Sequence, residues 1–147
     1  MSVQAADFDA AAEVVSLTAG RRDVGAVVTF TGLCRDEGGT LEALDIEHYP
    51  GMAEAEIGRV CAEAEARWPL LGCRVIHRHG TIAPGANIVL VVTASAHRAP
   101  AFAAADFLMD YLKGDAPFWK RNRRRGAAGG DWVAPRDADA AARGRWT

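Results

Sequence analysis

Two lysines in the last third of the chain have the clearest potential for chemistry. Lys113 and Lys120 stand on either side of the step APFW, which contains a proline and two adjacent aromatic residues. Because Lys120 directly follows Phe118 and Trp119, we expect its ammonium group to be shielded from water. Desolvation lowers the pKa of a lysine, and such a lysine can act as an acid–base group or a nucleophile near neutral pH.

Each lysine also has an ordinary structural explanation. A lysine in the last turn of a helix interacts favourably with the helix dipole, and this is the usual reason for a residue such as Lys113. A lysine in an edge strand blocks edge-to-edge aggregation, which would account for Lys120. The residue types alone leave both explanations open.

Three further cations come from other segments of the chain. His97 and Arg98 fall where a strand is expected to end and a helix to begin, and the free N–H groups of a helix N-terminus favour anions. An arginine in the first turn opposes the helix dipole, so a ligand is one reason for Arg98 to be there. Arg35 follows an apolar strand. The alternatives are that His97 packs and that both arginines are solvated. Together with the lysines, these residues predict a site for an anion such as phosphate or carboxylate.

The composition indicates one ordinary domain, residues 1–147. The chain has a formal net charge of −2, and 24% of its residues are charged. A net negative charge weighs against a general nucleic-acid-binding protein, because such domains usually carry a positive field. The alternative is a nucleic-acid-binding module in which Phe118, Trp119 and the arginines of NRRR provide stacking and phosphate contacts.

The chain shows no sign of export, membrane insertion or metal binding. Its first residues, MSVQAADFDAAAEVV, lack the basic segment and apolar core of a signal peptide. The longest mostly apolar run, 88–96, is too short to span a bilayer. The three cysteines have neither metal-ligand nor CxxC spacing. We therefore expect a cytoplasmic protein that makes no membrane contact, without a metal or a cofactor.

Periodicity and turn signals predict an α+β fold, with helices covering one face of a largely antiparallel sheet. The apolar segment 24–32 is expected to be a central strand. Expected helices cover 8–18, 51–68, 97–114 and 135–143, and expected strands cover 24–32, 41–49, 73–80, 87–95, 118–124 and 132–134.

A series of short motifs then resembles one family along nearly the whole chain. In order, these are GAVVTFTG, IEHYPGM, RWPL, VIHRHG, SAHRAPAF, MDYLK, APFWKR and DWV. The combination of SAHR, YLK and PFWK is similar to the large, catalytic subunit of molybdopterin synthase. This resemblance implies an α/β hammerhead-type sandwich with an additional small antiparallel β subdomain.

The resemblance also implies a reaction and partners. The family converts cyclic pyranopterin monophosphate to molybdopterin in molybdenum cofactor biosynthesis. Sulfur is supplied by a small ubiquitin-like sulfur-carrier subunit, as a thiocarboxylate on its C-terminal Gly-Gly. The large subunits form a homodimer with a small subunit at each end, which gives a heterotetramer.

The resemblance assigns roles to particular residues of this chain. Lys113 and Lys120 would be the catalytic lysines. The substrate-binding residues would be Arg35, His97, Arg98, Lys113, Lys120, Arg121 and Asn122. The sequence departs from the family pattern at Leu33, where a lysine is common, and in the basic, glycine-rich loop that follows Asn122.

Cys34 is the cysteine with the most plausible chemical role, since a guanidinium next to it in the sequence, that of Arg35, favours a thiolate. The resemblance, however, supplies sulfur from outside the chain, so no cysteine is needed. We therefore interpret Cys34, Cys61 and Cys73 as small packing residues.

Overall fold

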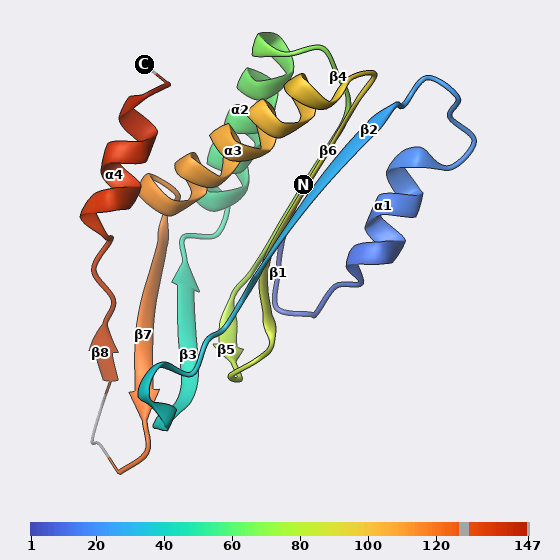
Figure 1. Ribbon diagram of the computed structural model, residues 1–147. Helices are drawn as coiled ribbons and strands as arrows, with labels where there is room; N and C mark the ends of the chain where they lie inside the picture. The colour runs from blue at the N-terminus through green and yellow to red at the C-terminus, as the bar shows by residue number, and fades with distance from the viewer. Residues whose placement is uncertain (127–129, 147) are drawn as a thin grey trace.

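The computed structural model describes residues 1–126 and 130–146 (Figure 1). Its helices are α1 (Ala10–Thr18), α2 (Met52–Arg67), α3 (Arg98–Gly114) and α4 (Asp137–Gly144), with a short 3-10 turn at Glu37–Gly39. Its strands are β1 (Ser2–Gln4), β2 (Ala26–Leu33), β3 (Leu41–His48), β4 (Leu70–Arg78), β5 (Gly80–Ile82), β6 (Asn87–Ser95), β7 (Phe118–Arg124) and β8 (Gly130–Trp132). Among the described helices, none is long and apolar enough to cross a membrane.

The strands form two four-stranded sheets, which confirms the α+β prediction. The first sheet has the order β1-β4-β6-β2 and the second has the order β5-β3-β7-β8. All pairs are antiparallel except β1 with β4. The second sheet corresponds to the small antiparallel subdomain that the resemblance implied.

The prediction that 24–32 forms a central strand is wrong. Strand β2 lies at the edge of the first sheet and pairs with β6 alone. Its side chains are not buried in the chain, and Val27, Phe30 and Leu33 are exposed. An apolar strand of this kind leaves both a row of backbone groups and hydrophobic side chains available to another chain.

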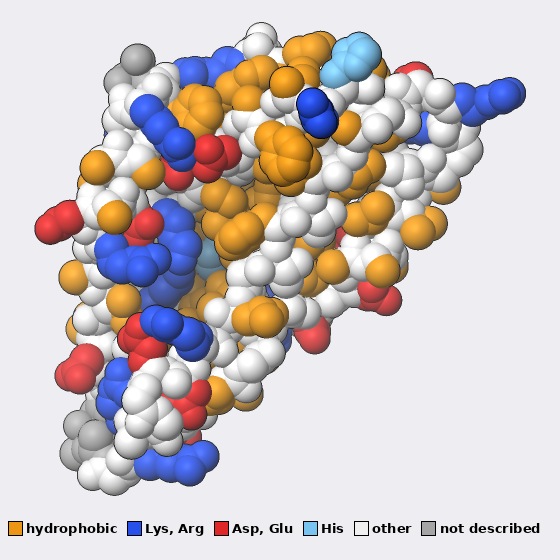
Figure 2. All heavy atoms as spheres, viewed as in Figure 1, with side chains coloured by type: hydrophobic (Ala, Val, Ile, Leu, Met, Phe, Trp, Pro, Cys, Tyr) orange, Lys and Arg blue, Asp and Glu red, His pale blue; other side chains and the backbone are white. Residues whose placement is uncertain are grey.

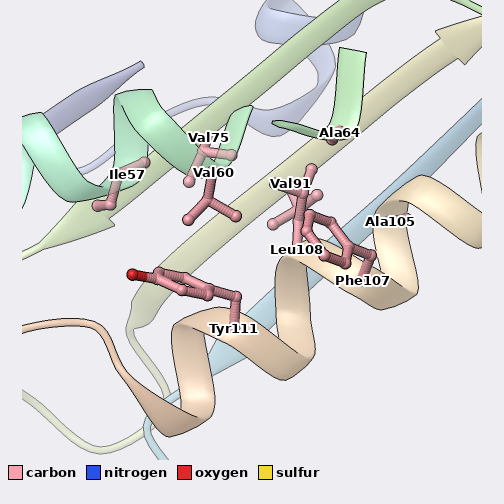
Figure 3. Packing of buried hydrophobic residues seen from close by; sticks show 9 residues of the cluster. All are labelled: Ile57, Val60, Ala64, Val75, Val91, Ala105, Phe107, Leu108 and Tyr111. Atoms are coloured by element: carbon pink, nitrogen blue, oxygen red, sulfur yellow. The ribbon is translucent and has the colours of Figure 1, made fainter. Parts of the chain in front are cut away.

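The first sheet carries helices on both faces, rather than on one as expected. On one face, α2 and α3 pack together over β4 and β6 (Figure 1). Figure 3 shows Ile57, Val60 and Ala64 of α2 facing Leu108 and other residues of α3 across this core. On the other face, α1 packs on Ile76, Leu90 and Val92. Neighbouring residues of a strand point to opposite faces, so the apolar run in β6 contributes both to the core beneath α2 and α3 and to the small apolar cluster beneath α1.

A second core joins the two sheets. It contains Cys34, strand β3 residues and the β6 residues Ile88 and Val89. Met109, Leu112 and Phe118 contact both this core and the one beneath α2 and α3. The end of α3 and the start of β7 therefore lie where the two cores meet.

The N-termini of α1 and α3 differ in how they are capped. The carboxylate of Asp9 accepts a hydrogen bond from the backbone N–H of Ala12 at 3.1 Å and caps α1. His97 is the N-cap residue of α3, but its side chain makes no capping bond. Ser95, two residues before His97, donates its hydroxyl to the Pro69 carbonyl and does not cap the helix. The N-terminus of α3 thus keeps unsatisfied N–H groups at an exposed position.

Candidate active site

Lys113 and Lys120 line one small cavity at the meeting point of the two cores. The cavity has a volume of about 60 Å³. Its walls come from β2, β4, β6, α3 and β7, and are formed by Phe30, Gly32, Leu33, His77, Ile88, Val89, Met109, Leu112, Lys113 and Lys120. The cavity is apolar apart from the two lysines and one histidine.

The turn between α3 and β7 brings the lysines together. Lys113 lies in the last turn of α3, which ends at Gly114. Pro117 cannot continue the helix, and β7 begins at the next residue and runs antiparallel to β3. Lys120 is paired with the buried Ile46 of β3, so its side chain leaves the strand beside the second core.

The pKa of Lys120 differs from that of an ordinary surface lysine because of its electrostatic environment. Burial, together with the charge of Lys113, lowers the pKa of Lys120 to about 8, while Asp139 of α4 acts in the opposite direction. The expected shielding by neighbouring aromatic residues is only partly correct, because Phe118 packs in the core whereas Trp119 is exposed. Lys120 can therefore exchange a proton near neutral pH.

These residues are also the only two lysines in the sequence, since the other fifteen basic residues are arginines. An arginine stays protonated under all ordinary conditions, whereas a lysine can lose its proton when it is desolvated. The chain thus uses arginine for its surface cations and places both lysines in one cavity. This distribution points to proton transfer or close charge stabilisation in that cavity.

We predict that Lys120 reacts with an amine-acylating reagent with a half-maximal rate near pH 8, because the neutral amine is the reactive form and is populated above its pKa of about 8. Peptide mapping by mass spectrometry over a pH series measures this rate. The Lys120→Met variant is the control for peptide assignment. A half-maximal rate near 10.5, the value of an unperturbed lysine, would contradict the lowered pKa.

His77 of β4 is the cavity residue that the sequence analysis missed. It is 3% exposed, and its ring stacks on Phe118 with centroids 3.8 Å apart. Burial, with Lys120, Lys113 and His48 nearby, lowers its pKa to about 3, so the ring is neutral at physiological pH. The alternation of apolar and polar residues in VIHRHG indicates that His77 lies on the same face of the strand as Val75 and is buried. Burial alone does not indicate a functional role, because a buried histidine is more often a packing residue.

Asn122 and Arg121 occupy opposite faces of β7. Alternation along a strand puts Asn122 on the face of Lys120. Arg121 instead lies 3.7 Å from the carboxylate of Asp45, with its guanidinium over the ring of Trp132. The substrate-binding assignment of Arg121 therefore stays a prediction that requires this side chain to turn.

The other arginines of the basic run also contact the protein itself. Arg123 pairs with Asp45 at 2.8 Å, and Arg124 donates to the Glu37 carbonyl and the Thr40 hydroxyl. Figure 2 shows Lys and Arg side chains over the β7 side of the molecule, with acidic side chains among them. A cross-strand ion pair accounts for Arg123 and hydrogen bonds to the protein account for Arg124, so neither contact favours the nucleic-acid-binding alternative.

Arg35 and the pair His97–Arg98 lie in different places relative to the lysines. Arg35 is exposed, two residues beyond the cavity residue Leu33, and pairs with Glu37. His97 and Arg98 are exposed at the opposite end of α3 from Lys113. At a helical rise of 1.5 Å per residue, roughly 22 Å separates the two ends. A single chain thus brings together the lysines but not His97 and Arg98.

The lysine cavity adjoins a larger apolar groove between β2 and α3. The groove has a volume of about 620 Å³ and includes Phe30 and Met109, which also line the lysine cavity. Figure 2 shows the hydrophobic side chains of this region beside the basic ones. The groove offers a path from the edge of the first sheet to the lysines.

Cys34 has the environment of a packing residue. It is 3% exposed in the second core, and burial, with the charge of Asp36, raises the pKa of its thiol. A thiol that stays protonated is a poor nucleophile. The thiols of Cys61 and Cys73 are neighbours between α2 and β4, and this interaction together with burial raises the pKa of Cys73.

We predict that Cys34→Ala keeps the sulfur-transfer rate within about twofold of the unchanged protein, because its thiol is protonated and outside the cavity lining. The measurement is product formation by the folded, purified variant. Loss of activity with unchanged folding and partner binding would show that the protein carries sulfur on its own thiol.

Fold and cavity together define an α+β enzyme domain with a cationic site. The family described as "MoaE protein" matches residues 3–115. A molybdopterin synthase catalytic subunit from Mesorhizobium japonicum is 65% identical, over 98% of this chain and 91% of its own. The corresponding subunit from Pseudomonas aeruginosa is 48% identical, over 98% of this chain and 96% of its own. The chain therefore belongs to the MoaE family, whose members are enzymes of molybdopterin synthesis, a part of molybdenum cofactor biosynthesis.

Solved structures support the same family. A molybdopterin biosynthesis MoaE protein from Burkholderia ambifaria has a TM-score of 0.81 and 44% identity, over 99% of this chain and 95% of its own. Molybdopterin synthase from Staphylococcus aureus has a TM-score of 0.80 and 27% identity, over 90% of this chain and 95% of its own. The family match ends before Lys120, but the alignments with relatives span nearly the whole chain.

Proposed function

We propose that this protein is the sulfur-transferring subunit of a molybdopterin synthase, which converts cyclic pyranopterin monophosphate to molybdopterin. The observation that carries the proposal is the placement of the chain's only two lysines in one cavity, one of them with a pKa of about 8. The family supplies the reaction, and the cavity supplies the cations that the reaction requires.

The proposed reaction brings negatively charged groups, the substrate phosphate and the thiocarboxylate, next to the two lysines. A thiocarboxylate sulfur attacks a side-chain carbon of the pyranopterin, and the carbon–sulfur bond forms as a carbon–oxygen bond at that carbon breaks; over the two transfers, one oxygen leaves with the opened cyclic phosphate and the other leaves as water. Hydrolysis of the acyl–sulfur bond then leaves the carrier's tail as a carboxylate. Two such transfers build the dithiolene. Fixed cations in a water-poor site stabilise this charge, each by about 3 kcal/mol. Lys120 can also donate or accept the proton that moves as the cyclic phosphate opens.

The sulfur donor is proposed to be a small ubiquitin-like subunit that ends in Gly-Gly. A structure from Helicobacter pylori with the same fold is described as a complex of subunits 1 and 2 of molybdopterin-converting factor. In this chain, the groove along β2 would admit an extended tail, since the edge strand has unpaired backbone groups and Phe30 and Met109 continue into the cavity. Glycines at the end of the tail carry no side chain to obstruct the narrow cavity.

A dimer would complete the substrate site. His97 and Arg98 are too far from the lysines of their own chain to hold the same small molecule, so they can bind the phosphate or pterin only from a second copy. Two copies related by a two-fold axis would each supply this pair to the other's lysine cavity. With a small subunit on each copy, the assembly is a heterotetramer.

Reconstitution tests the proposed function directly. The protein is incubated with a thiocarboxylated small subunit and cyclic pyranopterin monophosphate, and molybdopterin is assayed. The same small subunit without its terminal Gly-Gly is the matched control, and it should still dock but give no product. Absence of product with the intact thiocarboxylate would contradict the proposal.

A further inference from the structure

His77 presents a hydrogen-bond acceptor in a cavity whose other polar groups are donors. Its Nδ1 lies 2.8 Å from the backbone carbonyl oxygen of Arg78. A carbonyl oxygen can only accept, so Nδ1 carries the ring hydrogen and Nε2 keeps an unshared electron pair. Within the described residues, the structure gives Nε2 no hydrogen-bond partner.

The ring is held firmly in this orientation. It stacks on Phe118 at an interplanar angle of 14°, and His77 is paired in the sheet with Val89, another residue of the cavity wall. A ring fixed by stacking on one side and by its Nδ1 bond on another has little freedom to turn. The direction of Nε2 is thus set by the fold.

The amino groups of the two lysines need hydrogen-bond acceptors, which is what Nε2 of His77 can offer. An amino group has N–H donors and, when protonated, no acceptor. Across the described parts of the chain, the side-chain amino groups of Lys113 and Lys120 form no ion pair or hydrogen bond to protein. Lys120 is half-buried, comes from the same strand as Phe118, and follows it by two residues on the same face.

We propose that His77 is a positioning residue for Lys120: rotation of the flexible lysine side chain within the shared cavity lets its amino group donate a hydrogen bond to Nε2, which directs the remaining hydrogens or the electron pair of the amine at the substrate. This inference rests on the proposed function, since it assigns a role within the same sulfur-transfer site. No covalent bond changes at His77, and no proton is transferred to it.

A neutral acceptor suits this site better than a carboxylate would. A carboxylate beside Lys120 would raise its pKa and repel both the anionic substrate and the thiocarboxylate. Burial and the charges of Lys120 on β7 and Lys113 on α3 keep His77 neutral, and the ring of His48 on β3 acts in the same direction. Asp139 of α4 is the carboxylate that acts on Lys120. His77 can therefore orient the amine without neutralising the site.

Nitrogen NMR of the protein without substrate or partner gives the first test. With ¹⁵N-labelled histidine, the Nε2 resonance of His77 should have the position of an unprotonated nitrogen that accepts a hydrogen bond. Lys120→Met should move it to the position of a free acceptor, whereas the matched Lys113→Met should leave it nearly unchanged. A protonated Nε2, or an Nε2 chemical shift that does not change in Lys120→Met, would overturn the inference.

Activity gives the second test. His77→Phe keeps a ring to stack on Phe118 but removes the acceptor, and should lower kcat at least about tenfold, the scale of a hydrogen bond to a charged group. His77→Gln restores a polar atom near the Nε2 position and should recover most of this loss. His77→Asn reaches only the Nδ1 position and should not. His79→Gln, two residues away and outside the cavity lining, is the control and should behave as the unchanged protein.

The pH profile separates positioning from packing. A hydrogen bond to the ammonium form stabilises that form, so its loss lowers the pKa of Lys120. The limb of the profile that belongs to Lys120 should move to lower pH in His77→Phe and return in His77→Gln. If the three His77 variants and His79→Gln all had the activity and the pH profile of an unchanged protein that makes molybdopterin, the role of His77 would be refuted. An inactive unchanged protein would instead refute the proposed function, and the NMR test would still decide the role of His77.

Discussion

Lys120→Met is expected to lower the rate of molybdopterin formation at least about a hundredfold, the scale of one lost electrostatic contact to the transition state. Methionine keeps an unbranched stem of similar length in the cavity but carries no charge and no exchangeable proton. Lys113→Met is expected to cause a loss of the same order, since Lys113 supplies the second cation. Product formation under single-turnover conditions with thiocarboxylated partner measures both.

The interpretation requires that both variants stay folded and bind the partner. Thermal unfolding and partner affinity close to those of the unchanged protein establish this. Arg59→Met, which removes a surface cation paired with Glu56 and Glu63 outside the cavity, is the control for loss of one positive charge and should keep its activity. Near-normal turnover of either lysine variant would remove that lysine from the mechanism.

The sequence predicted much of the fold because its signals are local. The helix of 51–68 was predicted from apolar residues at helical spacing, and three of these residues, Ile57, Val60 and Ala64, are buried. Pro117 predicted the change from helix to extended chain that brings Lys120 back toward Lys113. These features depend on residues close together in the sequence, where spacing and turn chemistry are informative.

The errors concern contacts between distant segments. An apolar strand is compatible with a central position and with an exposed edge that another chain covers, so β2 was misplaced. The basic run after Lys120 is evident in the sequence, but Asp45, the partner of Arg121 and Arg123, lies on β3 and could not be found from spacing. His77 was overlooked because its significance depends on Phe118 and the lysines, which the fold brings to it from far along the chain.

The position of His97 and Arg98 leads to the second large effect, recovery of activity in a mixed dimer. One chain carries Lys120→Met and the other carries His97→Ala with Arg98→Ala, and each homodimer alone should be nearly inactive. If each lysine cavity takes His97 and Arg98 from the other copy, all the substitutions of the mixed dimer meet in one of its two sites. The other site then has the unchanged lysine of one chain and the unchanged His97 and Arg98 of the other. Coexpression with two different tags and purification through both isolates this dimer.

The purified mixed dimer should then show about half the activity of the unchanged dimer, because one of its two sites is intact. A mixed dimer of Lys113→Met with Lys120→Met is the matched control. Those two residues act from the same chain, so both of its sites stay defective and no activity should return. If the first mixed dimer were as inactive as its parents, His97 and Arg98 would not act in the partner copy's site. Their assignment to substrate binding would then be lost as well, because α3 holds them far from the lysines of their own chain.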